Sequence, residues 1–542
     1  MKLSLAGKPI LLVEDKPVIR KSIRDMLYGL NADAIVEADS GVAAVNAMAK
    51  TTFEIVLCDY NLGPGKNGQQ VLEEARHRKL IDYRSIFILI SSEQSTGAVL
   101  GAMDSKPDEY LTKPFNAQQL ISRLHRHFAR REYLAAIEKA MAKGDLAQAI
   151  RHCDTLLESG DGTMRLHLLK MRAELATSAG DFETARQIYG EVLQHRDLPW
   201  ARLGLAVIDF QTNDIEQAIA GLQNLVADNP MLMEGYDWLT RAYEALERHQ
   251  EVEQVLAQAL ELSPQSILRQ KKFAETADKN GNLEAAEKAY KAAVKLGKHS
   301  VHGSCSDYAG LAKLYAKTNA GEEALKTLNE MRQEYGNLPE AELRAATLEA
   351  DLFRAQGDED AAQQALEKAL ELCARLGSKA PRELQLEVAR SCFLNEQIGK
   401  AEAILHGLIH NHIDDEPFLN NLRAMQSGIG MHNHSEVLIQ KTKQVLVATN
   451  NKGVALYKQG KFNEALDLFE QAFSAMPENK TIILNMLKII IHDLKVNPFD
   501  EDKERRAKTL LKKAKLLGVE QHKLGVLQLE FGKLQRAAVA KV

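Results

Sequence analysis

Short apolar runs alternate with helical patterns of apolar residues between residues 9 and 128. Runs of this kind, separated by amphipathic helices, are typical of a parallel sheet that is covered on both faces. The pattern therefore predicts an α/β fold for this part of the chain. The expected strands are 9–15, 35–36, 54–59, 86–91 and 110–113, and the expected helices are 18–27, 41–48, 69–77, a poorer one around Val99 and Leu100, and 120–128.

Polar residues stand at the points where these apolar runs end. Glu14 and Asp15 close the first run, Asp59 closes the run at 54–59, and Ser91 and Lys113 close two later runs. The carboxyl ends of parallel strands meet at one edge of a sheet, where ligands bind in such folds. Three acids, a hydroxyl and a lysine at one edge would suit a divalent cation together with a phosphoryl group.

The order and context of these elements resemble the receiver domain of two-component response regulators, over residues 1–129. The resemblance implies a flavodoxin-like fold with a five-stranded parallel sheet, Asp59 as the phosphoacceptor and Mg²⁺ as the cofactor. In such a site a cation and a lysine neutralise the charge of the phosphoryl oxygens. The remaining implied roles are these: Glu14, Asp15, Asp59 and the backbone carbonyl of Asn61 hold Mg²⁺, Ser91 is the switch hydroxyl, Lys113 binds the phosphoryl group, Tyr110 is the switch aromatic, and Pro114 follows a cis peptide.

Each of these residues alone also has a purely structural interpretation. An aspartate at a strand end is often a turn or cap residue, and Lys-Pro is common in loops. Their joint occurrence in this order favours the receiver interpretation. Ser92 is the alternative to Ser91 as the switch hydroxyl.

A different pattern, without strand signals, begins after residue 130. A phrase of Gly or Asn, an acid or amide, an apolar residue and a later Ala recurs at intervals of about 34 residues, the period of a common helical repeat. The phrase begins at Gly144, Gly180, Asn213, Gly281 and Gly357, and a copy with Lys at the second position begins at Gly460. Segments of this length cannot bury an apolar face alone, so the copies are expected to stack.

The phrase resembles the tetratricopeptide repeat, a pair of antiparallel helices, and implies an all-α superhelical solenoid. Small residues would let the helices approach closely, and Tyr189, Tyr290 and Phe469 would fill the remaining space. The Gly-Asp or Gly-Asn pair would end the first helix of each repeat. Prolines that cannot continue the preceding helix would mark new repeats at Pro230, Pro264 and Pro477.

The quality of the match to the repeat varies along the rest of the chain and suggests three parts. We expect repeats over 130–410, an irregular helical segment or hinge over 411–445, and further repeats over 446–542. A non-repetitive helical bundle is the alternative, and the regular spacing opposes it.

The junction between the two patterns contains neither Pro nor Gly from Asn116 to Lys143. The last helix of the α/β domain and the first repeat helix are therefore expected to form one rod, about 40 Å long at 1.5 Å per residue. Such a rod would couple the domains more stiffly than a Ser/Gly linker.

Composition narrows the classes of function. The net charge of −5 argues against a nucleic-acid binder, since phosphate contacts require a basic surface. The five cysteines are scattered and lack metal-site spacing, which favours a reducing compartment. The start of the chain does not resemble a signal peptide, and the most apolar C-terminal stretch, Ile482 to Ile491, is too short to span a bilayer. We expect a cytoplasmic protein.

These observations predict a phosphorylation-dependent response regulator that acts through protein–protein interaction and not through DNA binding. The expected partners are a sensor histidine kinase or phosphotransfer protein, and an unknown protein or peptide in the repeat groove. Neither nucleic acid nor membrane insertion is expected, and a homodimer is left open. The chain is not expected to be an enzyme beyond phosphorylating and dephosphorylating its own aspartate.

Two alternatives remain at this point. In the first, the protein is an auxiliary regulator that inhibits or competes for phosphotransfer between a histidine kinase and another response regulator. In the second, an unrecognised catalytic segment lies in 300–445, although no nucleophile or metal phrase stands there.

Overall fold

A computed structural model of the chain forms two compact units, Met1–Ala320 and Gly321–Val542. The division falls inside the region predicted as one array, and the domain bounds inferred from the sequence stay predictions. The structure describes residues 4–92, 100–101, 103–159, 162–497, 500–519 and 521–539.

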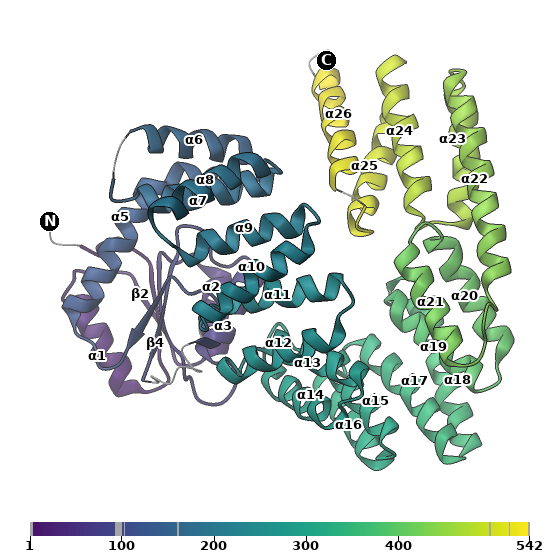
Figure 1. The fold of residues 1–542 in the computed structure, drawn as a ribbon, viewed down its shortest axis with the longest axis horizontal. Helices are drawn as coiled ribbons and strands as arrows, with labels where there is room; N and C mark the ends of the chain where they lie inside the picture. The colour runs from purple at the N-terminus through teal and green to yellow at the C-terminus, as the bar shows by residue number, and fades with distance from the viewer. Residues whose placement is uncertain are drawn as a thin grey trace. The chain divides into compact units, whose positions relative to one another are not determined.

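The first unit begins with an α/β domain around a five-stranded parallel sheet (Figure 1). The strand order is β2-β1-β3-β4-β5, and every neighbouring pair is parallel. The predicted α/β fold with five parallel strands is thus confirmed. The strands are β1 (Ile10–Val13), β2 (Ile35–Ala38), β3 (Ile55–Asp59), β4 (Ile86–Ser91) and β5 (Glu109–Thr112).

Helices cover both faces of this sheet, and successive strand residues supply the two cores in turn. Leu11 and Val13 belong to the core under α2 and α3, while Ile10 and Leu12 belong to the core under α1 and α5. This alternation explains why the central strands are apolar throughout. Residues 93–99 and 102 lie outside the described part, and so does most of the helix predicted around Val99 and Leu100. The four helices described in full are α1 (Pro17–Tyr28), α2 (Gly41–Lys50), α3 (Gly68–His77) and α5 (Ala117–Ala142).

Helix α5 is the rod predicted between the two patterns. Its 26 residues span about 39 Å at 1.5 Å per residue. Leu120 and Leu124 pack in the core of the α/β domain, whereas Leu134 and Ile137 pack in the core of the first repeat. One helix therefore takes part in both cores.

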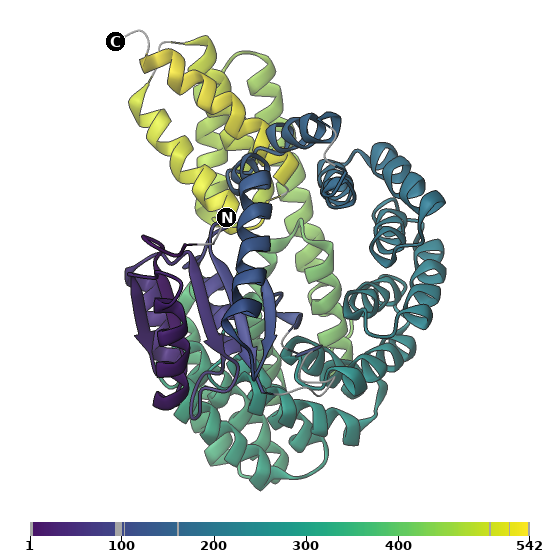
Figure 2. The same cartoon turned by 90° about the vertical axis from the view of Figure 1, so that its left-hand side faces the viewer.

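The rest of the first unit is a stack of helices that follow one another along an arc (Figure 2). Each helix packs on the next one in sequence. The helices are α6 (Leu146–Glu158), α7 (Arg165–Ala179), α8 (Phe182–His195), α9 (Pro199–Gln211), α10 (Ile215–Asp228), α11 (Met233–Ala245), α12 (His249–Leu262), α13 (Ile267–Asn280), α14 (Leu283–Gly297) and α15 (Cys305–Lys317).

The repeated phrase has the structural role that the sequence predicted. Gly180 ends α7 in the left-handed region, with φ +79°, and the Asp181 side chain accepts a hydrogen bond from the Thr184 amide at the start of α8. Small residues face the repeat aromatics: a Cβ added to Gly204 would lie 2.2 Å from the Tyr189 ring. The helices pack this closely because glycine leaves room for the ring.

The second unit consists of helices joined by turns over its described residues, and two hydrophobic cores lie in its middle and C-terminal parts. The long helix α22 joins them, since Ile439 belongs to one core and Leu446 packs against both. The helices are α16 (Gly321–Tyr335), α17 (Pro339–Gln356), α18 (Glu359–Leu376), α19 (Arg382–Leu394), α20 (Ile398–His412), α21 (Glu416–Gly428), α22 (Glu436–Lys458), α23 (Phe462–Ala475), α24 (Lys480–Val496), α25 (Glu501–Leu516) and α26 (Gln521–Val539), with a 3₁₀ turn, η1, at Gly377–Lys379.

Two stretches of this unit stood out in the sequence, one as a predicted irregular segment or hinge and one as the most apolar C-terminal run. Residues 411–445 form the end of α20, all of α21 and the first part of α22, and Phe418 and Leu422 are buried there; a hinge function stays a prediction. The apolar run Ile482 to Ile491 lies within α24, in the C-terminal core. None of the helices, over their described residues, is long and apolar enough to cross a membrane.

Candidate functional site

The predicted acids and the lysine meet at the carboxyl edge of the sheet. Parallel pairing of β1 with β3 sets Val13 beside Cys58, so that Glu14 and Asp59 follow side by side. Carboxylate oxygens of Glu14, Asp15 and Asp59 lie within 4.8 Å of one another. Lys113 Nζ donates to Glu14 Oε2 at 2.6 Å and lies 2.9 Å from Asp59 Oδ2.

Burial and neighbouring charges shift the pKa values of this group of residues. Glu14 is 1% exposed and Asp59 is 7% exposed. Burial raises the pKa of Glu14, the Lys113 hydrogen bond opposes it, and the charge of Asp59 raises the pKa further. Burial lowers the pKa of Lys113, but its bonds to Glu14 and Asp59 outweigh burial and hold that pKa above its ordinary value. One permanent cation therefore faces three carboxylates.

The surplus negative charge fits a divalent cation. Asp15 Oδ1 is buried and has no hydrogen-bond partner among the residues described. Because buried polar atoms are usually paired, a bound cation would satisfy this oxygen. Mg²⁺ prefers carboxylate and carbonyl oxygens. Asn61 follows Asp59 closely, and its side chain accepts from the Gly63 amide at 3.3 Å. The donor set is thus suited to Mg²⁺.

The remaining predicted residues lie at the ends of β4 and β5. Ser91 is buried at the end of β4, and its carbonyl accepts from the Lys113 amide at 2.8 Å, whereas Ser92 is exposed. Tyr110 pairs with Leu89 in the sheet and packs against the core under α2 and α3. The peptide bond between Lys113 and Pro114 is cis, as the resemblance implied. The switching roles stay predictions.

Helix α3 begins directly against Asp59. The Gly68 amide donates to the Tyr60 carbonyl at 2.8 Å, and a Cβ on Gly68 would lie 2.2 Å from the Asp59 carbonyl oxygen. Asn67 and Gln70 cap the helix reciprocally through side chain and backbone. The loop after Asp59 and the first turn of α3 are therefore packed directly against the backbone of Asp59.

Comparison with known proteins agrees with this geometry. The family model described as response regulator receiver domain matches residues 10–125, and three models described as tetratricopeptide repeat match 176–231, 343–375 and 448–479. The N-terminal domain is a response regulator receiver domain. Tetratricopeptide repeats follow it.

Individual relatives match the receiver domain. Response regulator protein PmrA of Pseudomonas aeruginosa is 34% identical over 115 residues, which are 21% of this chain and 50% of that protein, so the chain spans only half of that relative. Chemotaxis protein CheY-3 of Vibrio cholerae is 28% identical over 121 residues, 22% of this chain and 92% of that protein. A solved receiver domain of a P. aeruginosa sensor histidine kinase, with magnesium coordinated in its active site cleft, is 27% identical; the match covers 23% of this chain and 99% of that chain, with a TM-score of 0.21.

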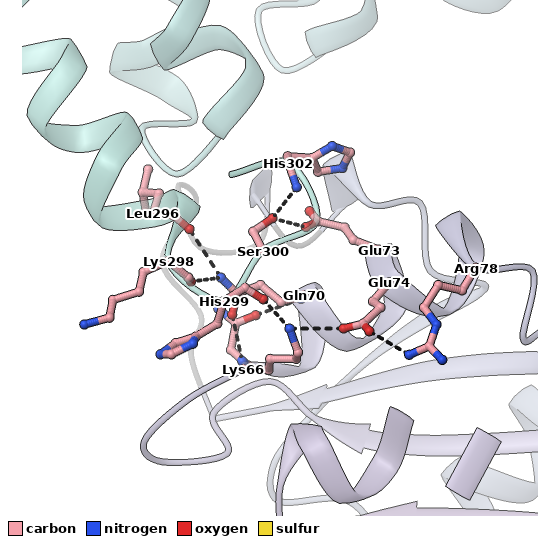
Figure 3. Close-up of polar contacts among 11 residues, drawn as sticks. Lys66, Gln70, Glu73, Glu74, Arg78, Leu296, Lys298, His299, Ser300 and His302 are labelled. Atoms are coloured by element: carbon pink, nitrogen blue, oxygen red, sulfur yellow. Dashed lines mark hydrogen bonds and ion pairs between the residues drawn. The ribbon is translucent and has the colours of Figure 1, made fainter. Parts of the chain in front are cut away.

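The receiver domain contacts the repeats through the loop that follows Asp59 (Figure 3). Lys66 Nζ donates to the His299 carbonyl at 2.5 Å. Gln70 Nε2 donates to the carbonyls of Leu296 and Lys298, at 3.3 and 3.2 Å. These carbonyls stand at the end of α14, where the helix dipole is negative, so the Lys66 cation is favourably placed. We call these contacts the α3 junction.

A second set of contacts, the Arg269 junction, begins on the segment after Ser91. Asp104 accepts from Arg269 Nη1 at 2.8 Å, from Arg269 Nη2 at 3.2 Å and from Ser263 Oγ at 3.0 Å. Arg269 also donates to Asp237, and its side chain is only 8% exposed. Burial lowers the pKa of Arg269, but the two carboxylates outweigh burial and raise it, so the guanidinium stays charged.

Neither junction was predicted from the sequence. Arg269 and Asp104 are 165 residues apart, and Lys66 and His299 are 233 residues apart. Each residue looks like an ordinary surface charge in its own segment. Lys66 was the residue whose position could have indicated a contact, because it lies in the glycine-rich loop after Asp59.

Proposed function

We propose that the protein is a phosphorylation-dependent response regulator that signals through the protein contacts of its repeats. An Asp59 carboxylate oxygen attacks the phosphorus of a phosphohistidine on a sensor kinase or phosphotransfer protein. The new O–P bond forms as the P–N bond breaks, and a proton then binds the released imidazole nitrogen. Receiver and repeat domains together support this proposal.

The neighbours of Asp59 have defined tasks in this proposal. Lys113, already 2.9 Å from Asp59, turns towards the phosphoryl oxygens and balances their charge. Glu14, Asp15, Asp59 and the backbone carbonyl of Asn61 hold Mg²⁺, which when bound neutralises charge on the transferred group. Afterwards the Ser91 hydroxyl donates to the phosphoryl group, and Tyr110 changes its position in response.

One observation carries the link from receiver to output. Both junctions lie after reactive strand ends along the chain: Lys66 comes after Asp59, and Asp104 comes after Ser91. Phosphorylation of Asp59 is therefore proposed to alter both junctions. Gly68, packed on the Asp59 carbonyl, transmits movement to the first turn of α3. The proposal is that phosphorylation changes the contacts between receiver and repeats at both junctions.

The proposal includes the location and partners of the chain. All five cysteines are free and buried, which suits a reducing cytoplasm. The net charge of −5 favours a protein partner over DNA. The bounds 1–129, 130–410, 411–445 and 446–542 are part of the proposal as the receiver, the first array, the hinge segment and the last repeats.

The test uses beryllofluoride, a mimic of the phosphoryl group, with Mg²⁺. Small-angle scattering and oligomeric state are measured for the wild type and for Asp59→Ala. We expect a change in the wild type alone, because the variant cannot bind the mimic. Identical profiles, with ¹⁹F NMR showing beryllofluoride bound to the wild type, would contradict the output by movement of the repeats and favour competition for phosphoryl groups.

A further inference from the structure

The last repeats enclose a cavity that the proposed function does not yet use. It lies between α22, α24 and α26 and has a volume of about 560 Å³. Pockets that hold small ligands or a few side chains measure roughly 300–1,000 Å³. The apolar part of the lining, which we call its base, includes Val454, Phe469, Ile489 and Leu527. Val454 is 38% exposed and the other three are buried, so Val454 is the residue of the base that a partner can contact.

Three exposed lysines, Lys458, Lys488 and Lys495, line the same cavity. Within the described part of the chain, none of them forms an ion pair. Other lysines of this unit do: Lys503 bonds Asp493, and Lys443 bonds Glu416 at 2.5 Å. The three lysines therefore bring positive charge to the cavity that no described acid pairs with, and this charge attracts an anionic partner.

The polar side of the cavity is arranged by one face of α24. Asn485, Lys488, His492 and Lys495 follow one another at steps of three and four residues, which set them on one face of a helix. Asn485 Nδ2 donates to Asn450 Oδ1 at 2.6 Å, and the His492 ring lies 5.1 Å from that of Tyr457. These contacts fix the polar side before any partner arrives.

The chemistry favours a peptide over other anions. A sugar–phosphate backbone would satisfy the lysines but would leave the exposed side chain of Val454 without an apolar partner. An amphipathic segment offers both kinds of group, with apolar side chains for the base and carboxylates for the rim. The lining contains three lysines and one acid, Glu530, so two positive charges are in excess.

We propose that this cavity, the α24 groove, docks an acidic, amphipathic segment of a partner protein. A leucine or aromatic side chain of that segment packs on Val454. Its carboxylates pair with Lys458, Lys488 and Lys495. The inference rests on the proposed function, since it names the kind of partner that the repeats recognise.

The probe is a display library of random twelve-residue peptides, selected on the full chain. We expect the enriched peptides to carry net negative charge with at least one large apolar residue. Their affinity, measured by fluorescence anisotropy, should fall at least tenfold in Lys458→Glu/Lys488→Glu/Lys495→Glu and should weaken as salt is raised. Val454→Asp should weaken binding as well, because it puts a charge at the apolar base.

The control variant reverses three exposed lysines of the same unit that do not line the groove, Lys441, Lys452 and Lys512, with the same change in net charge. It should bind the selected peptides like wild type. Equal losses in both triple variants would overturn the proposal, as would enrichment of neutral or basic peptides or no enrichment at all. If the first triple variant does not fold, Lys488→Glu and Val454→Asp decide the question. Asp59 takes no part in this assay, so a negative result leaves the phosphorylation proposal to its own test.

Discussion

The receiver site and the repeats bring their key residues together in opposite ways. At Asp59, the contact between Lys113 and Glu14 joins residues 99 positions apart. In the repeats, Tyr189 packs against Gly204, which lies on the next helix along the chain. The site depends on the whole sheet, while each repeat contact depends on neighbours alone.

The comparison shows where sensitivity to substitution should lie. Loss of one residue in the receiver site removes a function that no other residue supplies. Loss of one repeat contact weakens a local interface and leaves the others intact. The two junctions share features of both regions, because residues far apart in the sequence form contacts there between a repeat helix and the receiver.

The largest expected effect follows removal of the phosphoacceptor. Asp59→Ala should abolish phosphorylation by a small phosphodonor, because it removes the proposed phosphoacceptor and the other carboxylate that contacts Lys113, Glu14, is only 1% exposed. Phosphate-affinity electrophoresis measures it, with Asp39→Asn, an exposed acid of the same domain, as control. Phosphorylation that persists in Asp59→Ala would show that another residue can replace Asp59, which contradicts the comparison.

The Arg269 junction should be the most sensitive contact outside the site. Arg269→Gln leaves Asp104 and Asp237 without their cation, and we expect a loss of about 3 kcal/mol in the free energy of unfolding of the first unit. Arg241→Gln, which removes an exposed guanidinium over the Trp238 ring, should cost about 0.5–1 kcal/mol. Denaturant titration compares the two; equal costs would mean that the junction is no stronger than a surface contact.

Removal of one proposed metal ligand should weaken Mg²⁺ binding without unfolding the domain. Asp15 is only partly buried and its Oδ1 lacks a partner among the described residues, so Asp15→Asn changes charge more than packing. We expect roughly a tenfold or larger loss of Mg²⁺ affinity, since affinity follows the charge of the ligands. Calorimetric titration measures it. Unchanged affinity would remove Asp15 from the site, and chelation of Mg²⁺ should prevent phosphorylation in the wild type.

The smallest effect is expected within a repeat, where two glycines form a matched pair. Gly204→Ala sets a Cβ 2.2 Å from the Tyr189 ring and should destabilise by about 1–3 kcal/mol. Gly190→Ala, on the preceding helix with no atom within 4 Å, should stabilise by up to about 1 kcal/mol. Chemical denaturation of both variants gives the sign. The same sign for both would show that the close approach of helix and ring is not what requires glycine at Gly204.

Sequence reasoning reached those features that depend on strand ends and repeat period. Glu14, Asp59 and Lys113 could be placed together because parallel strands end at one edge. The rod over α5 followed from the lack of Pro and Gly between Asn116 and Lys143. Both rules use local pattern alone.

The features that were missed lack any local pattern. The pair of Arg269 with Asp104 depends on how the arc of repeats returns to the receiver, which no short window of sequence encodes. The lysines of the α24 groove look like an ordinary solvated face until α22 and α26 close around them. Lys503 on α25 also looks like a surface charge in its own segment, yet its amine donates to the buried Asp493 of α24.

Hydrogen exchange of the junctions tests the central claim most directly. The wild type and Asp59→Ala are compared with and without beryllofluoride and Mg²⁺, following peptides that cover 262–270 and 296–304. The account predicts faster amide exchange in both segments of the wild type on adding beryllofluoride, and no change in the variant. Unchanged exchange in the wild type, with ¹⁹F NMR showing Asp59 occupied, would contradict the claim that the receiver signals through these junctions.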